Sequence, residues 1–263
     1  MPLEVPETCI AVLLFLFGLA LGSFFNVCIC RIPREESVVS PPSHCPSCGQ
    51  TISWWQNIPV FSYLLLRGRC FSCKQAISPR YVLVELLTGC LFLAVFLHGG
   101  WRLATISQLF FIALLIPITF IDLDYQIIPD RFSLGGIVLG FLSSFCCSGV
   151  SWQQSGLGIV VGGGTLWIIA EGYYRFTGRE GMGGGDVKLL AMIGAFLGVK
   201  SLLLVILVSS LAGSLIGIML MVRSHRNSQY AVPFGPFLAF GAAVYLFWGE
   251  PLISWYFGWM AGS

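Results

Sequence analysis

The fold is decided by the apolar run Cys9–Cys30, CIAVLLFLFGLALGSFFNVCIC, which carries no charged residue. A helix of this length is about 33 Å long at 1.5 Å per residue, enough to cross a hydrocarbon core of about 30 Å. The residues before it include no Lys or Arg, so the positive region of a cleaved signal peptide is missing. We therefore predict that this run is a retained first membrane span.

The composition of the whole chain agrees with a membrane protein. Of its 263 residues, 56% are hydrophobic and only 10% are charged, whereas a soluble domain carries about 25% charged residues. A soluble globular protein and a disordered chain are both excluded by these proportions. The apolar runs are continuous rather than alternating, which favours helices over the strands of a barrel. The sequence has no dense basic stripe, so we predict no nucleic-acid partner. The predicted partner is the lipid bilayer.

Hydropathy predicts an all-α, polytopic helical membrane protein with about eight spans. After the first, the predicted spans are Tyr81–Leu97, Leu103–Ile121, Phe132–Val150, Gly156–Tyr174, Val187–Val199, Ser201–Val222 and Ala231–Trp248. The sixth is short, so a tilted or re-entrant segment is an alternative there. With the N-terminus outside, twelve of the 14 Lys and Arg residues lie in cytoplasmic segments, all except Arg102 and Lys200. The positive-inside rule therefore favours that orientation.

Three regions follow from this pattern: a first span over 1–30, a cytoplasmic loop over 31–80 and a membrane core over 81–263. The loop holds the pairs Cys45/Cys48 and Cys70/Cys73, in the pattern C-x2-C-x21-C-x2-C. This spacing is typical of a structural zinc site with four thiolate ligands, although unrelated reduced thiols or a redox pair are alternatives. Disulfides are disfavoured in the cytoplasm, and a metal would supply folding free energy that a loop with few apolar residues lacks.

The chain has four aspartates, and the parity of the spans brings them to one face of the membrane. Asp122, Asp124 and Asp130 lie between the third and fourth predicted spans, and Asp186 precedes the sixth. Ionisable groups at membrane depth are costly and by default indicate function. Two close carboxylates in a low-dielectric site share a proton, which is what aspartyl proteolysis requires.

Structural roles for these carboxylates remain open at this point. Asp186 or Asp130 would serve as the N-cap of the helix that follows it. The other two aspartates would form interfacial ion pairs with Arg131 or Lys188.

Several motifs together resemble the type IV prepilin peptidase family. Gly183-Gly184-Gly185-Asp186 matches the GxGD element of intramembrane aspartyl proteases, whose glycines would let a substrate backbone come close. The segment from Asp122 to Asp130 matches the other acidic element of the family. Further similar segments are Gly22-Ser23-Phe24-Phe25-Asn26-Val27 with Arg31, the two C-x2-C pairs, Arg67-Gly68-Arg69-Cys70, Glu85-Leu86-Leu87-Thr88-Gly89 and Pro233-Phe234-Gly235-Pro236.

The resemblance implies two activities at a bacterial inner membrane. The first is an aspartyl endopeptidase that removes the short basic leader of prepilins or pseudopilins at the cytoplasmic face. The second is an N-methyltransferase that uses S-adenosylmethionine on the new N-terminal amine. The implied catalytic pair is Asp122 and Asp186, and the implied zinc ligands are Cys45, Cys48, Cys70 and Cys73. The supporting residues are Asp124, Asp130, Gly183, Gly185 and Lys188, the last of which would help to set the charge state of the pair.

The methyl-donor site is not assigned to residues and is expected near the first loop and its flanking spans. A peptidase without methyltransferase activity is a second hypothesis, and the presence of four cysteines argues against it. A transporter is a third, and it would place polar residues in mid-span and show repeat symmetry. The aspartates instead cluster at one face and no repeat is visible, which favours the enzyme.

Overall fold

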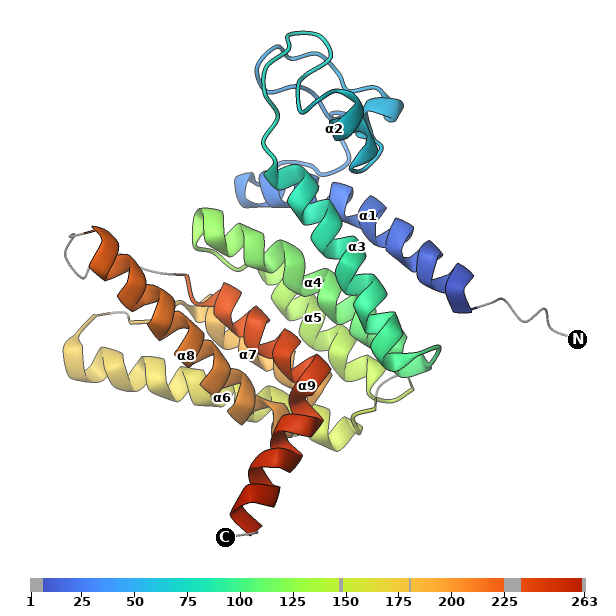
Figure 1. Cartoon of the computed structure of the whole chain (residues 1–263). Coiled ribbons are helices and arrows are strands. Elements are labelled where there is room, and N and C mark those ends of the chain that lie inside the picture. Colours follow the sequence, from blue (N-terminus) through green and yellow to red (C-terminus); the bar gives the residue numbers. More distant parts are fainter. Residues whose placement is uncertain (1–6, 147–148, 180, 225–232, 262–263) are drawn as a thin grey trace, which may run out of the picture. The chain divides into compact units, whose positions relative to one another are not determined.

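The computed structural model describes residues 7–146, 149–179, 181–224 and 233–261, and within these ranges the chain forms helices and no β-strand. Figure 1 shows long helices and one extended loop between α1 and α3. The elements are α1 (Glu7–Arg31), η1 (Ile32–Arg34), η2 (Trp54–Asn57), α2 (Phe61–Leu65), α3 (Arg80–Gly99), α4 (Leu103–Tyr125), α5 (Asp130–Ser143), α6 (Trp152–Thr177), α7 (Gly184–Leu197), α8 (Val199–Ser224) and α9 (Gly235–Ala261). The predicted all-α fold is confirmed.

Each predicted span overlaps one of these helices, but the helices differ in length. Within the described ranges, six helices are long and apolar enough to cross a membrane: α1, α3, α4, α6, α8 and α9. The helices α5 and α7 have 14 residues each, which is about 21 Å and shorter than the hydrocarbon core. The count of eight spans and the orientation therefore stay predictions. Residues 147–148 of the fourth predicted span and 231–232 of the last lie outside the described ranges.

The chain divides into two compact units, unit 1 (Met1–Thr105) and unit 2 (Ile106–Ser263). Unit 1 contains α1, the long loop and α3, and unit 2 contains nearly all of α4 and the helices that follow it. The three regions predicted from the sequence were defined by their hydropathy and cysteine content, not by packing. This division stays a prediction.

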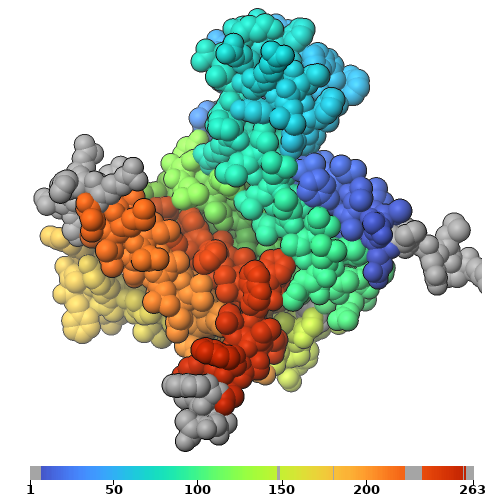
Figure 2. Space-filling view, viewed as in Figure 1, coloured from blue at the N-terminus to red at the C-terminus, as the bar shows by residue number. Residues whose placement is uncertain are grey.

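Unit 1 is built on a close contact between α1 and α3. A Cβ atom at Gly18 would lie 2.8 Å from the Cα atom of Gly89, and one at Gly22 would lie 2.6 Å from the Cα atom of Glu85. The helix α1 thus presents two glycines four positions apart to the backbone of α3, and small residues at this spacing allow the close approach of membrane helices. Beyond their ends, the side chains of the loop 32–79 form one compact body (Figure 2).

Unit 2 is built around α7. All eight residues of Leu189–Phe196 are buried, as expected of a helix that is apolar on every side. On one side α6 approaches so closely that no Cβ would fit at Gly158 or Gly194, because each would meet the backbone of the other. The Ser155 hydroxyl donates to the Ala195 carbonyl across this contact at 2.7 Å.

Candidate active site and candidate metal centre

Asp122 lies in the last turn of α4 and is 5% exposed. The helix continues to Tyr125, four residues beyond the predicted end at Ile121, so Asp122 and Asp124 are both helical. Residues two apart on a helix are about 200° apart around its axis. Accordingly Asp124 is exposed while Asp122 is buried. The side chain of Asp122 accepts a hydrogen bond from the backbone N–H of Gly235, at 3.0 Å.

Asp186 is the third residue of α7 and is 9% exposed. The N-cap of α7 is Gly183, so the alternative that Asp186 is the N-cap is wrong. Its carboxylate accepts a hydrogen bond from the Gly183 N–H and is close enough to Asp122 for the two charges to interact. A carboxylate that reaches back from the third helical residue to the N-cap N–H is half of a capping box.

The structure therefore brings together two buried carboxylates from helices that are 64 residues apart in sequence. One lies at the C-terminal end of α4 and the other at the N-terminal end of α7. Two carboxylates that interact in a buried site can share one proton. This arrangement can supply one general base and one general acid.

The glycines before Asp186 have different surroundings. A Cβ at Gly185 would lie 2.9 Å from the Cβ atom of Ile128, so only glycine fits there. A Cβ at Gly183 would meet its first neighbour at 3.9 Å, and one at Gly184 would meet nothing within 4 Å. Gly185 thus lets α7 pack against Ile128, and the open side of Gly184 is compatible with the predicted approach of a substrate backbone.

Lys188 is paired with Asp130, with 2.6 Å between Nζ and Oδ1. The two side chains are 38% and 58% exposed, so this is a surface ion pair between the second turn of α7 and the first residue of α5. The N-cap of α5 is Pro129, so Asp130 is not the cap. The influence of Lys188 on the charge state of the aspartate pair stays a prediction.

In unit 1 the four cysteines of the two C-x2-C pairs come together. Their sulfur atoms all lie within 4.8 Å of one another, and the Sγ atoms of Cys45 and Cys73 are 3.9 Å apart. Zinc–sulfur bonds of about 2.3 Å in a tetrahedron place sulfur atoms about 3.8 Å apart. The cluster therefore has the ligand number and the dimensions that a zinc ion needs, and four thiolates leave no open coordination position.

The two pairs fold as matching turns. In each, the N–H of the first cysteine donates to the carbonyl five residues on, from Cys45 to Gln50 at 2.9 Å and from Cys70 to Gln75 at 2.8 Å. The residue after the second cysteine has a left-handed backbone, with φ of 70° at Gly49 and 60° at Lys74. Glycine adopts this conformation freely, whereas lysine does so at a cost.

The same turns favour the thiolate form of the first cysteine in each pair. The backbone N–H groups of Cys48 and Ser47 donate to the sulfur of Cys45 and lower the pKa of this thiol to about 6. The corresponding N–H groups of the second turn lower the pKa of Cys70. The thiolate is the form that binds metal.

One buried carboxylate connects α3 to the loop, and the sequence motif around it did not reveal this role. Glu85 is 7% exposed, and it accepts a hydrogen bond from the Val60 N–H at 2.8 Å and another from the Ser23 side chain. Val60 itself has φ 62° and ψ −50°, a strained backbone for a β-branched residue. The carboxylate thus holds a strained turn of the loop against the helical hairpin.

Gly235 and Ile128 lie beside the aspartate pair, and the sequence offered no reason to connect either of them with it. A Cβ at Gly235 would lie 2.6 Å from the Oδ2 atom of Asp122 and 3.3 Å from the Cδ1 atom of Ile128. The motif Pro233-Phe234-Gly235-Pro236 indicated that Gly235 has a role. Because the interacting group is a backbone N–H, however, the sequence could not show which residue it contacts.

Comparisons with known proteins identify the family of the chain. The model of the Bacterial Peptidase A24 N-terminal domain matches residues 16–99, and that of the Type IV leader peptidase family matches residues 109–218. The prepilin leader peptidase/N-methyltransferase of Aeromonas hydrophila is 40% identical over 93% of this chain and 92% of its own length. The proteins of the same name from Legionella pneumophila and Neisseria gonorrhoeae are 36% and 41% identical, over 93% and 84% of this chain and 94% and 84% of their own lengths.

No solved structure matches the chain significantly. The family models cover most of both units, and the relatives are similar along nearly their full lengths. The chain belongs to the type IV leader peptidase family.

Proposed function

We propose that this protein removes the leader of type IV prepilins or pseudopilins and then methylates the new N-terminal residue. The observation that carries the proposal is the pair of buried carboxylates, Asp122 and Asp186, which two separate helix ends bring together. The names of the curated relatives support both the substrate class and the second activity.

In the cleavage reaction, the ionised member of the pair takes a proton from a water molecule, which attacks the carbonyl carbon of the scissile bond. The protonated member gives its proton to the carbonyl oxygen. The tetrahedral intermediate then collapses and the C–N bond breaks. The leaving nitrogen takes the proton that came from water, and a hydroxyl of the intermediate returns its proton to the other carboxylate, which restores the pair. Gly183 and Gly185 serve this step by shaping the start of α7 around Asp186.

In the methylation reaction, S-adenosylmethionine supplies the methyl group to an amine that exists only after cleavage. We place this activity with unit 1, because the chain adds there a metal-binding loop that the aspartyl chemistry does not need. Cys45, Cys48, Cys70 and Cys73 would hold one structural Zn²⁺ and thereby order the loop. The protein would act in the bacterial inner membrane with both sites open to the cytoplasm, as the distribution of Lys and Arg predicts.

The test is incubation of the purified protein with a prepilin peptide, with and without S-adenosylmethionine, followed by mass spectrometry. We expect cleavage after the leader in both reactions and a mass gain of one methyl group only with the donor.

Asp122→Asn and Asp124→Asn form a matched pair for this assay, because they are two residues apart and differ in burial. The first should abolish cleavage and the second should not. An inactive Asp124→Asn beside an active Asp122→Asn would move the catalytic assignment by two residues.

A further inference from the structure

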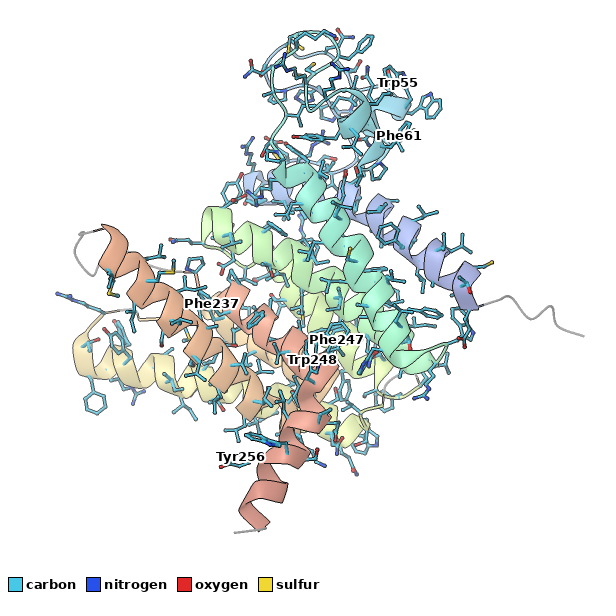
Figure 3. All side chains as sticks on the ribbon, viewed as in Figure 1. Trp55, Phe61, Phe237, Phe247, Trp248 and Tyr256 are labelled. Atoms are coloured by element: carbon cyan, nitrogen blue, oxygen red, sulfur yellow. The ribbon has the colours of Figure 1, made fainter. Side chains whose placement is uncertain are left out.

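The start of α9 is arranged so that one backbone donor remains available. The first N–H groups of a helix have no partner within the helix. In α9, Pro236 has no N–H, and the N–H groups of Phe237 and Leu238 donate to the carbonyl of Phe234 at 3.0 and 3.1 Å. Phe237 marks this first turn in Figure 3. The remaining donor of the turn is the N–H of the residue before Pro236.

That donor belongs to Gly235, and it is directed at Asp122. The distance from the Gly235 nitrogen to the Oδ2 atom of Asp122 is 3.0 Å, and both groups are buried. The two residues are 113 positions apart in sequence. The carboxylate of Asp122 therefore caps a helix other than its own, where the N-terminal end of the helix dipole also favours a negative charge.

The same position has no room for a side chain. A Cβ atom at Gly235 would lie 2.6 Å from Oδ2 and 3.2 Å from Cγ of Asp122, well inside van der Waals contact. Any other amino acid would displace the carboxylate from the place where the N–H now holds it. The hydrogen bond from the Gly235 N–H and the lack of room for a side chain at Gly235 thus both constrain the carboxylate of Asp122.

We propose that Gly235 is a positioning residue of the leader peptidase reaction. Its N–H fixes the Asp122 carboxylate in one orientation through Oδ2, so that Oδ1 is the oxygen that takes the proton from water or shares it with Asp186. This inference rests on the proposed function of the aspartate pair. It assigns a role to a residue beyond position 218, where the match to the leader peptidase family model ends.

The first experiment compares two alanine variants of the same helix. Gly235→Ala should lower kcat for cleavage about 100-fold, the effect of a misplacement of about 1 Å at a catalytic group, while KM changes little. The control is Gly241→Ala, where a Cβ would also lie 2.6 Å from its nearest atom, and its nearest atoms are the hydroxyl oxygen of Ser209 and the carbonyl oxygen of Val205 rather than a carboxylate. It should lose thermal stability to a similar degree but keep kcat. An equal fall in kcat for both variants would overturn the proposal, because it would then reflect helix packing alone.

The second experiment removes the hydrogen bond without adding an atom. Incorporation of glycolic acid at position 235 replaces the N–H by an ester oxygen, and kcat should fall about tenfold or more, which is the usual effect of losing a hydrogen bond to a charged group. Full activity of the ester would show that the N–H does not position Asp122. Asp122→Asn in the same assay separates the two levels of inference. If that variant is inactive and the Gly235 variants are normal, only the positioning role fails, whereas an active Asp122→Asn would refute the aspartyl pair itself.

Discussion

Unit 1 and unit 2 both bring two helices together through glycines, but they keep their reactive groups in different places. In unit 1, α1 meets α3 at Gly18 and Gly22, and the thiols lie in a loop beyond the helix ends. In unit 2, α6 meets α7 at Gly158 and Gly194, and the carboxylates are buried at the helix ends themselves. A metal-binding loop can lose its order while the hairpin that carries it persists. The position of a buried carboxylate pair, in contrast, depends on the packing of the helices around it.

This difference indicates that the two activities can be separated by mutation. Damage to the cysteine loop should act first on methylation and substrate docking, because the proposed acid and base of cleavage are Asp122 and Asp186. Damage to the aspartate pair should act on cleavage alone. The predictions below test this contrast, from the largest expected effect to the smallest.

Asp186→Asn should reduce cleavage about 10²- to 10⁴-fold, because it removes one half of an acid–base pair. The same variant should still methylate a pre-cleaved pilin peptide that begins with a free Phe. The measurement is transfer of a labelled methyl group from the donor to this peptide. If the variant folds and binds the peptide but transfers no methyl group, the division between the units is wrong.

Replacing Cys45 and Cys48 together by Ser should remove the metal and lower methylation at least as much as cleavage. Elemental analysis should find about one zinc per chain in the unmodified protein and none in the variant, since two thiolates cannot complete the site. A suitable control is the double variant Cys9→Ser and Cys90→Ser, which changes two exposed thiols outside the cluster. Loss of zinc in that control, or its absence from protein purified without chelators, would count against the site.

Gly158→Ala should destabilise unit 2 by about 1–3 kcal/mol, because the added methyl group meets the backbone of α7. Gly164→Ala, in the same helix, adds a methyl group that meets nothing within 4 Å. It should be neutral or stabilising by up to about 1 kcal/mol, as expected from helix propensity. Unfolding of both variants in detergent measures the difference, and equal stabilities would mean that the contact between α6 and α7 tolerates a wider spacing.

The smallest effect is expected at the ion pair of Lys188 with Asp130. Both side chains are exposed, so a double-mutant cycle with Lys188→Ala and Asp130→Ala should give a coupling free energy below about 1 kcal/mol, and added salt should reduce it. Cleavage should stay within a few fold of normal. A large fall in kcat for the single variant Lys188→Ala, together with a normal kcat for the single variant Asp130→Ala, would instead support a direct influence of Lys188 on the aspartate pair.

Most of the fold could be predicted from the sequence, because long apolar runs have few alternatives in a bilayer. The end of α4 was placed too early at Ile121, since hydropathy falls at Asp122 while the backbone remains helical to Tyr125. That difference matters at the site. The continued helix separates Asp122 from Asp124 by burial, a distinction that the sequence motif alone could not make.

The residue types and spacings of both sites were also visible in the sequence, whereas their supporting contacts were not. The spacing of the Cys pairs is typical of a four-thiolate metal site, and the cluster forms as predicted. The contact of Gly235 with Asp122 and that of Glu85 with Val60 both use a backbone N–H as donor. Every non-proline residue carries such a donor, so only the folded chain shows which of them is used.

The close packing of α1 against α3 has a consequence for the chemistry of the metal site. Because these two helices meet through their backbones, they hold the two ends of the loop near each other before any ion binds. The packing of the two helices has therefore already restricted the loop, so the loop loses less conformational entropy when its four thiolates bind one ion. The two cysteine pairs therefore have a raised effective concentration relative to each other. As a result, the loop binds a metal ion more tightly when it is attached to the two packed helices. The same loop, excised as a peptide, should bind zinc more weakly although it retains all four ligands.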